Sequence, residues 1–160
     1  STAETVLDRA FEYCAQKLGL DDGQAALARL KQGEGTAYQY CSYSIAQQIG
    51  LSIATSDDHV KSVYVVDYDA TPDDLCFAGQ GGSPPVHMLV WTARKTRALE
   101  ALIEALDQAL TRRYAALVEL GELYHLLDVQ VVDDAEVEKR TGLGAMLHSI
   151  HQRPIQVWPR

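Results

Sequence analysis

The sequence lacks a hydrophobic run long enough to cross a lipid bilayer. Among its 160 residues, no uninterrupted apolar stretch approaches the roughly 18 residues that a membrane-spanning helix needs. The first residues, STAETVLDRAFEYC, carry acids where a signal peptide has a basic region followed by an apolar stretch. We therefore expect a cytoplasmic protein that does not bind membranes.

Cysteine is also scarce. Cys14, Cys41 and Cys76 are odd in number and contain no C-x-x-C spacing. This pattern argues against both a disulfide framework and a zinc ribbon. We expect reduced thiols that are mostly packed inside the protein.

Positive charge is in deficit. Fourteen Lys and Arg residues face 22 Asp and Glu residues, which gives a formal net charge of −8. The protein as a whole therefore repels nucleic acids and anionic membranes, and we do not expect a nucleic acid partner. The composition, 47% hydrophobic and 22% charged, is that of an ordinary globular protein, and the length predicts a single domain over residues 1–160.

Helical periodicity is clear in several segments. Apolar residues at helical spacing predict an amphipathic helix over residues 2–18, which ends at Gly19. The pair Asp21 and Asp22 can cap a second helix that ends near Gly33. A third helix is expected from Thr36, and a long helical stripe runs from Thr96 to about Gly121.

Strand-like segments alternate with these helices. Residues 62–67, 86–92 and 126–132 are predicted as buried strands, and IQVW at residues 155–158 as a terminal edge strand. Short helices are expected from Asp133 or Asp134 through Arg140 and around residues 146–150. The turn-rich connection favours an antiparallel first pair of strands, and the long helix requires a parallel second pair. The prediction is an α+β fold with a small mixed sheet.

This topology brings four titratable residues to one rim of the sheet. Asp67 and Asp69 follow the first strand, His87 begins the second and Asp128 lies near the start of the third. Acids at strand ends are common because solvent meets the sheet there, which is the simpler interpretation. As a metal site, the four residues would offer mixed nitrogen and oxygen ligands, which suit Zn²⁺ or Mn²⁺ better than Mg²⁺.

Three segments carry a resemblance to a known family. They are VKSVYVVDYD, PPVHMLVWTARKT and LLDVQVVDDAEVEKRTG. With the order of helices and strands, they resemble the polymerase-β-like nucleotidyltransferases, especially small bacterial members. The resemblance covers residues 37–158, leaves residues 1–34 as a helical extension, and implies a nucleotidyltransferase-like core.

The resemblance also implies a degenerate active site. Active members have a Gly-Ser pair after the first strand, an Asp-x-Asp at the second, and an aspartate in the third that completes a site for two Mg²⁺ ions. Here Asp67 and Tyr68 stand at the Gly-Ser place, and Pro85, Val86 and His87 at the Asp-x-Asp place. Only Asp128 matches, as a remnant of the catalytic triad. We therefore expect a catalytically inactive protein that works in binding or assembly.

Three cations lie at the start of the long helix. Arg94, Lys95 and Arg97 stand where the helix dipole disfavours positive charge. Either nearby acids neutralise them, or they form an anion site together with the helix N–H groups. The length of the second strand places this cluster ~20 Å from the acidic rim, too far to share a small substrate.

Two alternative functions stay open. One is an active nucleotidyltransferase with a relocated acidic metal site. The other is a DNA-binding regulator with a helix-turn-helix over residues 44–61. The competing interpretation of this segment is one continuous helix. The expected partner is another protein or a second copy of the chain, as in a homodimer, with a nucleotide as a further ligand. We expect no cofactor, with a divalent metal (Mg²⁺, Mn²⁺ or Zn²⁺) as the alternative.

Overall fold

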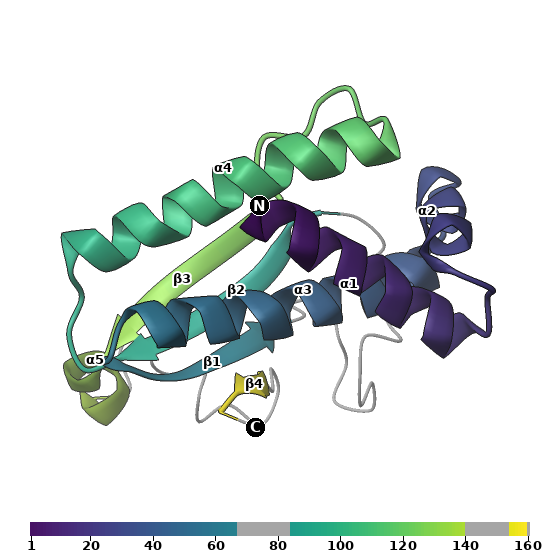
Figure 1. Ribbon diagram of the computed structural model, residues 1–160. Helices are drawn as coiled ribbons and strands as arrows, with labels where there is room; N and C mark the ends of the chain where they lie inside the picture. The colour runs from purple at the N-terminus through teal and green to yellow at the C-terminus, as the bar shows by residue number, and fades with distance from the viewer. Residues whose placement is uncertain (67–83, 140–153, 160) are drawn as a thin grey trace.

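The computed structural model describes residues 1–66, 84–139 and 154–159 (Figure 1). Several predictions fall outside these ranges. They concern Asp67, Tyr68, Asp69 and Cys76, and the short helix around residues 146–150.

A four-stranded mixed sheet forms the centre of the described fold. Its strands are β1 (Val60–Val66), β2 (Val86–Thr92), β3 (Leu127–Asp133) and β4 (Ile155–Trp158), in the order β3-β2-β1-β4. β1 runs antiparallel to both β2 and β4, whereas β2 and β3 are parallel. The predicted α+β class and both predicted strand pairings are confirmed.

Helices connect and flank these strands. They are α1 (Thr2–Leu18), α2 (Gly23–Lys31), α3 (Gly35–Ser56), α4 (Arg97–Val118) and α5 (Asp134–Lys139). The side chains of Ser1, Asp22 and Thr96 accept hydrogen bonds from backbone N–H groups in the first turns of α1, α2 and α4. These caps explain why the predicted starts of the three helices agree closely with the structure.

The main core lies between the sheet and the helices α1, α3 and α4, which flank the same face of the sheet (Figure 1). Alternate strand residues such as Val63, Met88 and Val90 point toward this layer and are almost fully buried. α3 comes very close to the sheet at Gly50, where an added Cβ would lie 3.4 Å from side-chain atoms of both Val63 and Val157. Glycine therefore suits this position because it lets the helix and the strands approach closely.

The residues that alternate with these point to the opposite face. At one end of that face, Val137 of α5 packs with Leu89, Val132 and Val66. Next to this small cluster, the Trp91 indole N–H donates to Asp134, and Lys61 forms an ion pair with the same carboxylate. Both contacts lower the pKa of Asp134 below its usual range.

α3 continues without interruption through most of the segment considered for a helix-turn-helix. Residues 44–56 are helical, so Gly50 lies inside the helix and not in a turn. The alternative of a helix-turn-helix over residues 44–61 is therefore wrong, because the close packing at Gly50 favours a continuous helix over the sheet.

Two of the three thiols are buried and free, as predicted. Cys14 donates to the backbone oxygen of Ala37, and burial raises its pKa to about 11. Cys41 is fully enclosed, and burial raises its pKa as well. Within the described ranges, no helix combines the length and the apolar character that crossing a bilayer would require.

Candidate functional site

His87 and Asp128 form a pair at the predicted rim of the sheet. They are neighbours in the parallel register of β2 and β3, and the Nδ1 atom of His87 lies 2.8 Å from Oδ2 of Asp128. Val66, the last residue of β1, pairs with His87, so the end of β1 reaches the same rim. The structure thus brings together two of the four residues predicted there, while Asp67 and Asp69 lie outside the described residues.

Gln130 completes a small polar cluster with this pair. Its side-chain N–H₂ donates to the second oxygen of Asp128 over 2.9 Å, so both carboxylate oxygens of Asp128 are engaged. The side chains of His87 and Asp128 are each about one-third exposed. A carboxylate bound to Nδ1 fixes the orientation of an imidazole, so this cluster holds His87 in place at the solvent boundary.

A second acidic residue, Asp107 of α4, organises the start of β3. One of its oxygens accepts hydrogen bonds from the Leu127 backbone N–H and from the Thr111 hydroxyl, each 2.9 Å long. The Thr111 hydroxyl in turn accepts from the backbone N–H of Leu126 over 2.8 Å. Asp107 is only 7% exposed, and these bonds give its buried carboxylate the partners it needs. They also fix the start of β3 against α4.

His125 binds the other oxygen of Asp107, with Nδ1 2.5 Å from Oδ2. The hydrogen bond and the negative charge of Asp107 raise the pKa of His125 above its usual value. Sequence reasoning missed this cluster. The available signal was that Asp107 and Thr111 stand four residues apart within the apolar stripe of α4, where a polar pair needs partners.

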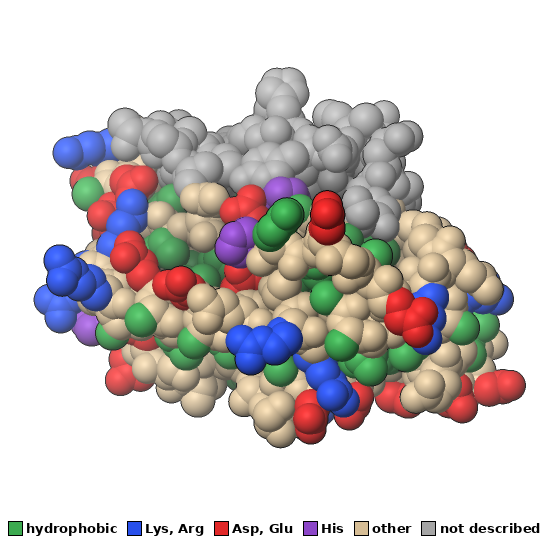
Figure 2. Space-filling model, turned by 90° about the horizontal axis from the view of Figure 1, so that it is seen from above, with side chains coloured by type: hydrophobic (Ala, Val, Ile, Leu, Met, Phe, Trp, Pro, Cys, Tyr) green, Lys and Arg blue, Asp and Glu red, His purple; other side chains and the backbone are tan. Residues whose placement is uncertain are grey.

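A cleft of about 680 Å³ runs between α4 and β3; we call it the β3-edge cleft. Ile103 of α4 and the strand residues Val129 and Val131 give it apolar surface. Figure 2 shows acidic side chains gathered next to hydrophobic ones in the hollow beside α4. The acids that line the cleft are Glu100, Glu104, Asp107 and Asp128.

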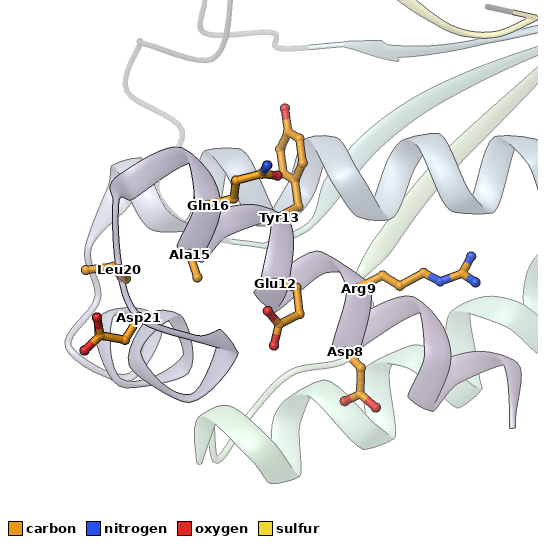
Figure 3. A pocket seen from close by; sticks show the side chains of 8 residues that line it. All are labelled: Asp8, Arg9, Glu12, Tyr13, Ala15, Gln16, Leu20 and Asp21. Carbon is orange, nitrogen blue, oxygen red and sulfur yellow. The ribbon is translucent and has the colours of Figure 1, made fainter.

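Another cleft, of about 650 Å³, lies beside α1; we call it the α1 cleft. Figure 3 shows Asp8 and Glu12 on one side of α1, with Tyr13 and Gln16 pointing to another side. A carboxylate oxygen of Glu12 accepts a hydrogen bond from the Gly23 backbone N–H, which connects α1 to the start of α2. Arg9 also lines this cleft, so its charge is mixed.

The predicted basic cluster is partly neutralised. Lys95 forms an ion pair with Glu136 of α5, as expected if nearby acids compensate the cations. Arg94 and Arg97 are exposed. An anion site at Arg94, Lys95 and Arg97 remains a prediction.

The residues that the structure describes contain no group of three or more His, Cys, Asp or Glu side chains arranged to hold a metal ion. The predicted metal site of Asp67, Asp69, His87 and Asp128 includes two residues outside that part of the chain. His87 and Asp128 would supply one nitrogen and one oxygen ligand to such a site.

Comparisons with known proteins add no relative. No family model matches the chain, and no match was found among curated proteins or solved structures. The function is therefore inferred from the chemistry of the described residues.

Proposed function

We propose that this protein is a nucleotidyltransferase-like domain that has no transferase activity and works by binding another protein. Two features support the proposal. A helix-rich N-terminal part precedes a mixed sheet in which an antiparallel pair is followed, through the long helix α4, by a parallel third strand. The residues at the rim of that sheet, moreover, are poorly suited to two-metal chemistry.

The state of Asp128 is the observation that carries the proposal. It is the one residue that matches the metal-binding triad of the family, and both of its oxygens are engaged by His87 and Gln130. The neighbouring strand offers an imidazole where the family has carboxylates. Mg²⁺ prefers oxygen ligands, and transfer through two ions requires several carboxylates to neutralise the phosphates.

Calorimetric titration tests this proposal. ATP with Mg²⁺ or Mn²⁺ should give no binding heat that depends on Asp128. The matched variants are Asp128→Asn, which keeps the shape of the side chain, and Gln130→Ala, which releases one oxygen of Asp128. Micromolar binding by the unmodified protein that Asp128→Asn abolishes would overturn the proposal.

A relocated metal site is the second candidate function. The 2.8 Å contact of His87 with Asp128 places a nitrogen and an oxygen ligand together, and Asp67 follows directly after Val66, the partner of His87. Such a site would take Zn²⁺ or Mn²⁺. Titration with each metal, repeated on His87→Gln and Asp128→Asn, tests it: loss of metal binding in both variants would favour an active transferase over an inactive one.

A further inference from the structure

We propose that the outer edge of β3 binds an extended, cationic segment of another protein, which adds to the sheet as a new strand. This inference rests on the proposed binding function and names its site and the class of partner. Strand addition to a sheet edge is a common way to recognise extended peptides, since backbone hydrogen bonds give affinity and alternate side chains give specificity.

The first argument is the direction of the backbone groups of β3. Among the described residues, β3 lies at the end of the sheet and pairs with β2 alone. The backbone oxygen of Leu126 accepts from the N–H of Val86 on β2 over 2.7 Å. Because the backbone groups of successive strand residues point to opposite sides, those of Leu127, Val129 and Val131 point away from β2.

The first backbone N–H of this edge is already bonded. Leu127 donates it to the Asp107 carboxylate of α4. Asp107 thus takes the position of an acceptor on a neighbouring strand, but it serves only the first residue of the edge. Beyond it, the N–H and C=O groups of Val129 and Val131 face the β3-edge cleft, which both residues line.

The charge of the cleft indicates the chemistry of the partner. Glu100 and Glu104 are exposed on the wall that α4 contributes, and among the described residues neither forms an ion pair with a cation. Lys95, which also lines the cleft, is already paired with Glu136. An added strand whose Lys or Arg side chains point toward α4 would complement these acids, and the aliphatic parts of the same side chains would contact Ile103 and the two valines.

The same charges disfavour a second copy of the chain as the occupant. Antiparallel pairing of two β3 strands would bring Glu100, Glu104 and Asp128 of both copies to one interface. Each copy also has a net charge of −8. Like charges facing one another across an interface oppose association, so a cationic partner fits better.

Fluorescence anisotropy with a labelled peptide, Lys-Val-Lys-Val-Lys-Val-Lys, tests the proposal on the full chain. The variant Glu100→Lys/Glu104→Lys should weaken binding about tenfold or more, since each reversal replaces an attraction by a repulsion. The matched control is Glu4→Lys/Asp8→Lys, which reverses two exposed acids at the same spacing in the first turns of α1 and should leave the affinity unchanged.

A backbone variant separates strand pairing from simple charge attraction. Val131→Pro removes an N–H that points to the open edge and leaves the hydrogen bonds to β2 in place. It should weaken binding about tenfold while circular dichroism shows a folded protein. The peptide Lys-Pro-Lys-Pro-Lys-Pro-Lys has the same charge but cannot form a strand. Its affinity for the unmodified protein should be no higher than the affinity of the Lys-Val peptide for Val131→Pro.

Three results would overturn the proposal. The first is that the unmodified protein binds the valine and proline peptides with equal affinity. The second is that the Glu100→Lys/Glu104→Lys variant binds the valine peptide as tightly as the unmodified protein does. The third is a homodimer in sedimentation that Val131→Pro dissociates. The nucleotide titration is independent of these results. If the peptide does not bind and calorimetry shows no nucleotide binding that depends on Asp128, this inference alone is rejected. Nucleotide binding that depends on Asp128 would instead reject the proposed function.

Discussion

The two clefts of this protein have nearly the same volume, about 680 Å³ beside β3 and about 650 Å³ beside α1. They differ in what their walls can offer. The α1 cleft is lined mainly by a helix, whose backbone groups are bonded within the helix. The other is lined by β3, which pairs on one side only within the described part of the chain. Volume alone therefore says little about binding, and the direction of backbone groups says more.

The side chains of the two clefts are also held differently. In the α1 cleft, among the described residues, Glu12 accepts one hydrogen bond, from the backbone N–H of Gly23, and Arg9 lies with the acids Asp8, Glu12 and Asp21. In the β3-edge cleft, Asp107 accepts from Thr111, Leu127 and His125. The latter cleft is thus built on a buried network, which is expected to make it more rigid.

The largest expected effect comes from Asp107. Asp107→Ala leaves the N–H of Leu127 without its acceptor in a buried position, and should lower the free energy of unfolding by about 2–4 kcal/mol. The counterpart in the α1 cleft, Glu12→Ala, should cost only about 1 kcal/mol, since it removes one part-buried hydrogen bond. Urea unfolding of both variants measures the difference. Equal losses would contradict the contrast between the two clefts.

Thr111 should have a smaller effect. Thr111→Val keeps the shape but removes the hydroxyl that links the backbone N–H of Leu126 to Asp107, and should cost about 1–2 kcal/mol. Thr111→Ser retains the hydroxyl and serves as the control, with a smaller loss in the same urea experiment. If Ser and Val variants were equally destabilised, the methyl group and not the hydrogen bonds would be responsible.

The effect of His125 should depend on pH. Its pKa in the folded protein is raised by Asp107, and also by Asp128 and Glu104 nearby. The stabilisation is therefore fully present below the ordinary pKa of 6.5 and is lost as the pH rises through the raised value. The difference in free energy of unfolding between the unmodified protein and His125→Gln should be largest in mildly acidic solution and should disappear at alkaline pH. A gap that widens with rising pH would contradict the assignment.

Much of the fold could be predicted from local patterns. α1 and β2 agree with their predicted bounds, because apolar periodicity, a capping residue and β-branched residues mark them in the sequence. The length of the segment between β2 and β3 fixed their parallel pairing. The end of α3 was harder to place, because this helix packs against both α1 and the sheet and therefore carries buried residues around much of its circumference.

The candidate site was predictable only in part. Register arguments brought His87 and Asp128 to one rim, and their contact follows from that placement. The bond of Asp107 to His125 depends on how α4 crosses the start of β3, which no local pattern states. The open edge was equally hidden, since a sequence does not show on which side of a sheet a strand will lie.

Amide hydrogen exchange of β3 tests the central claim most directly. In the free protein, the N–H groups of Val129 and Val131 should exchange quickly, while those of Asp128 and Gln130, which face β2, should be protected. Saturation with the Lys-Val peptide should slow exchange at Val129 and Val131 and leave Asp128 and Gln130 unchanged. Strong protection of Val129 and Val131 before any peptide is added, or no change on its addition, would contradict the account.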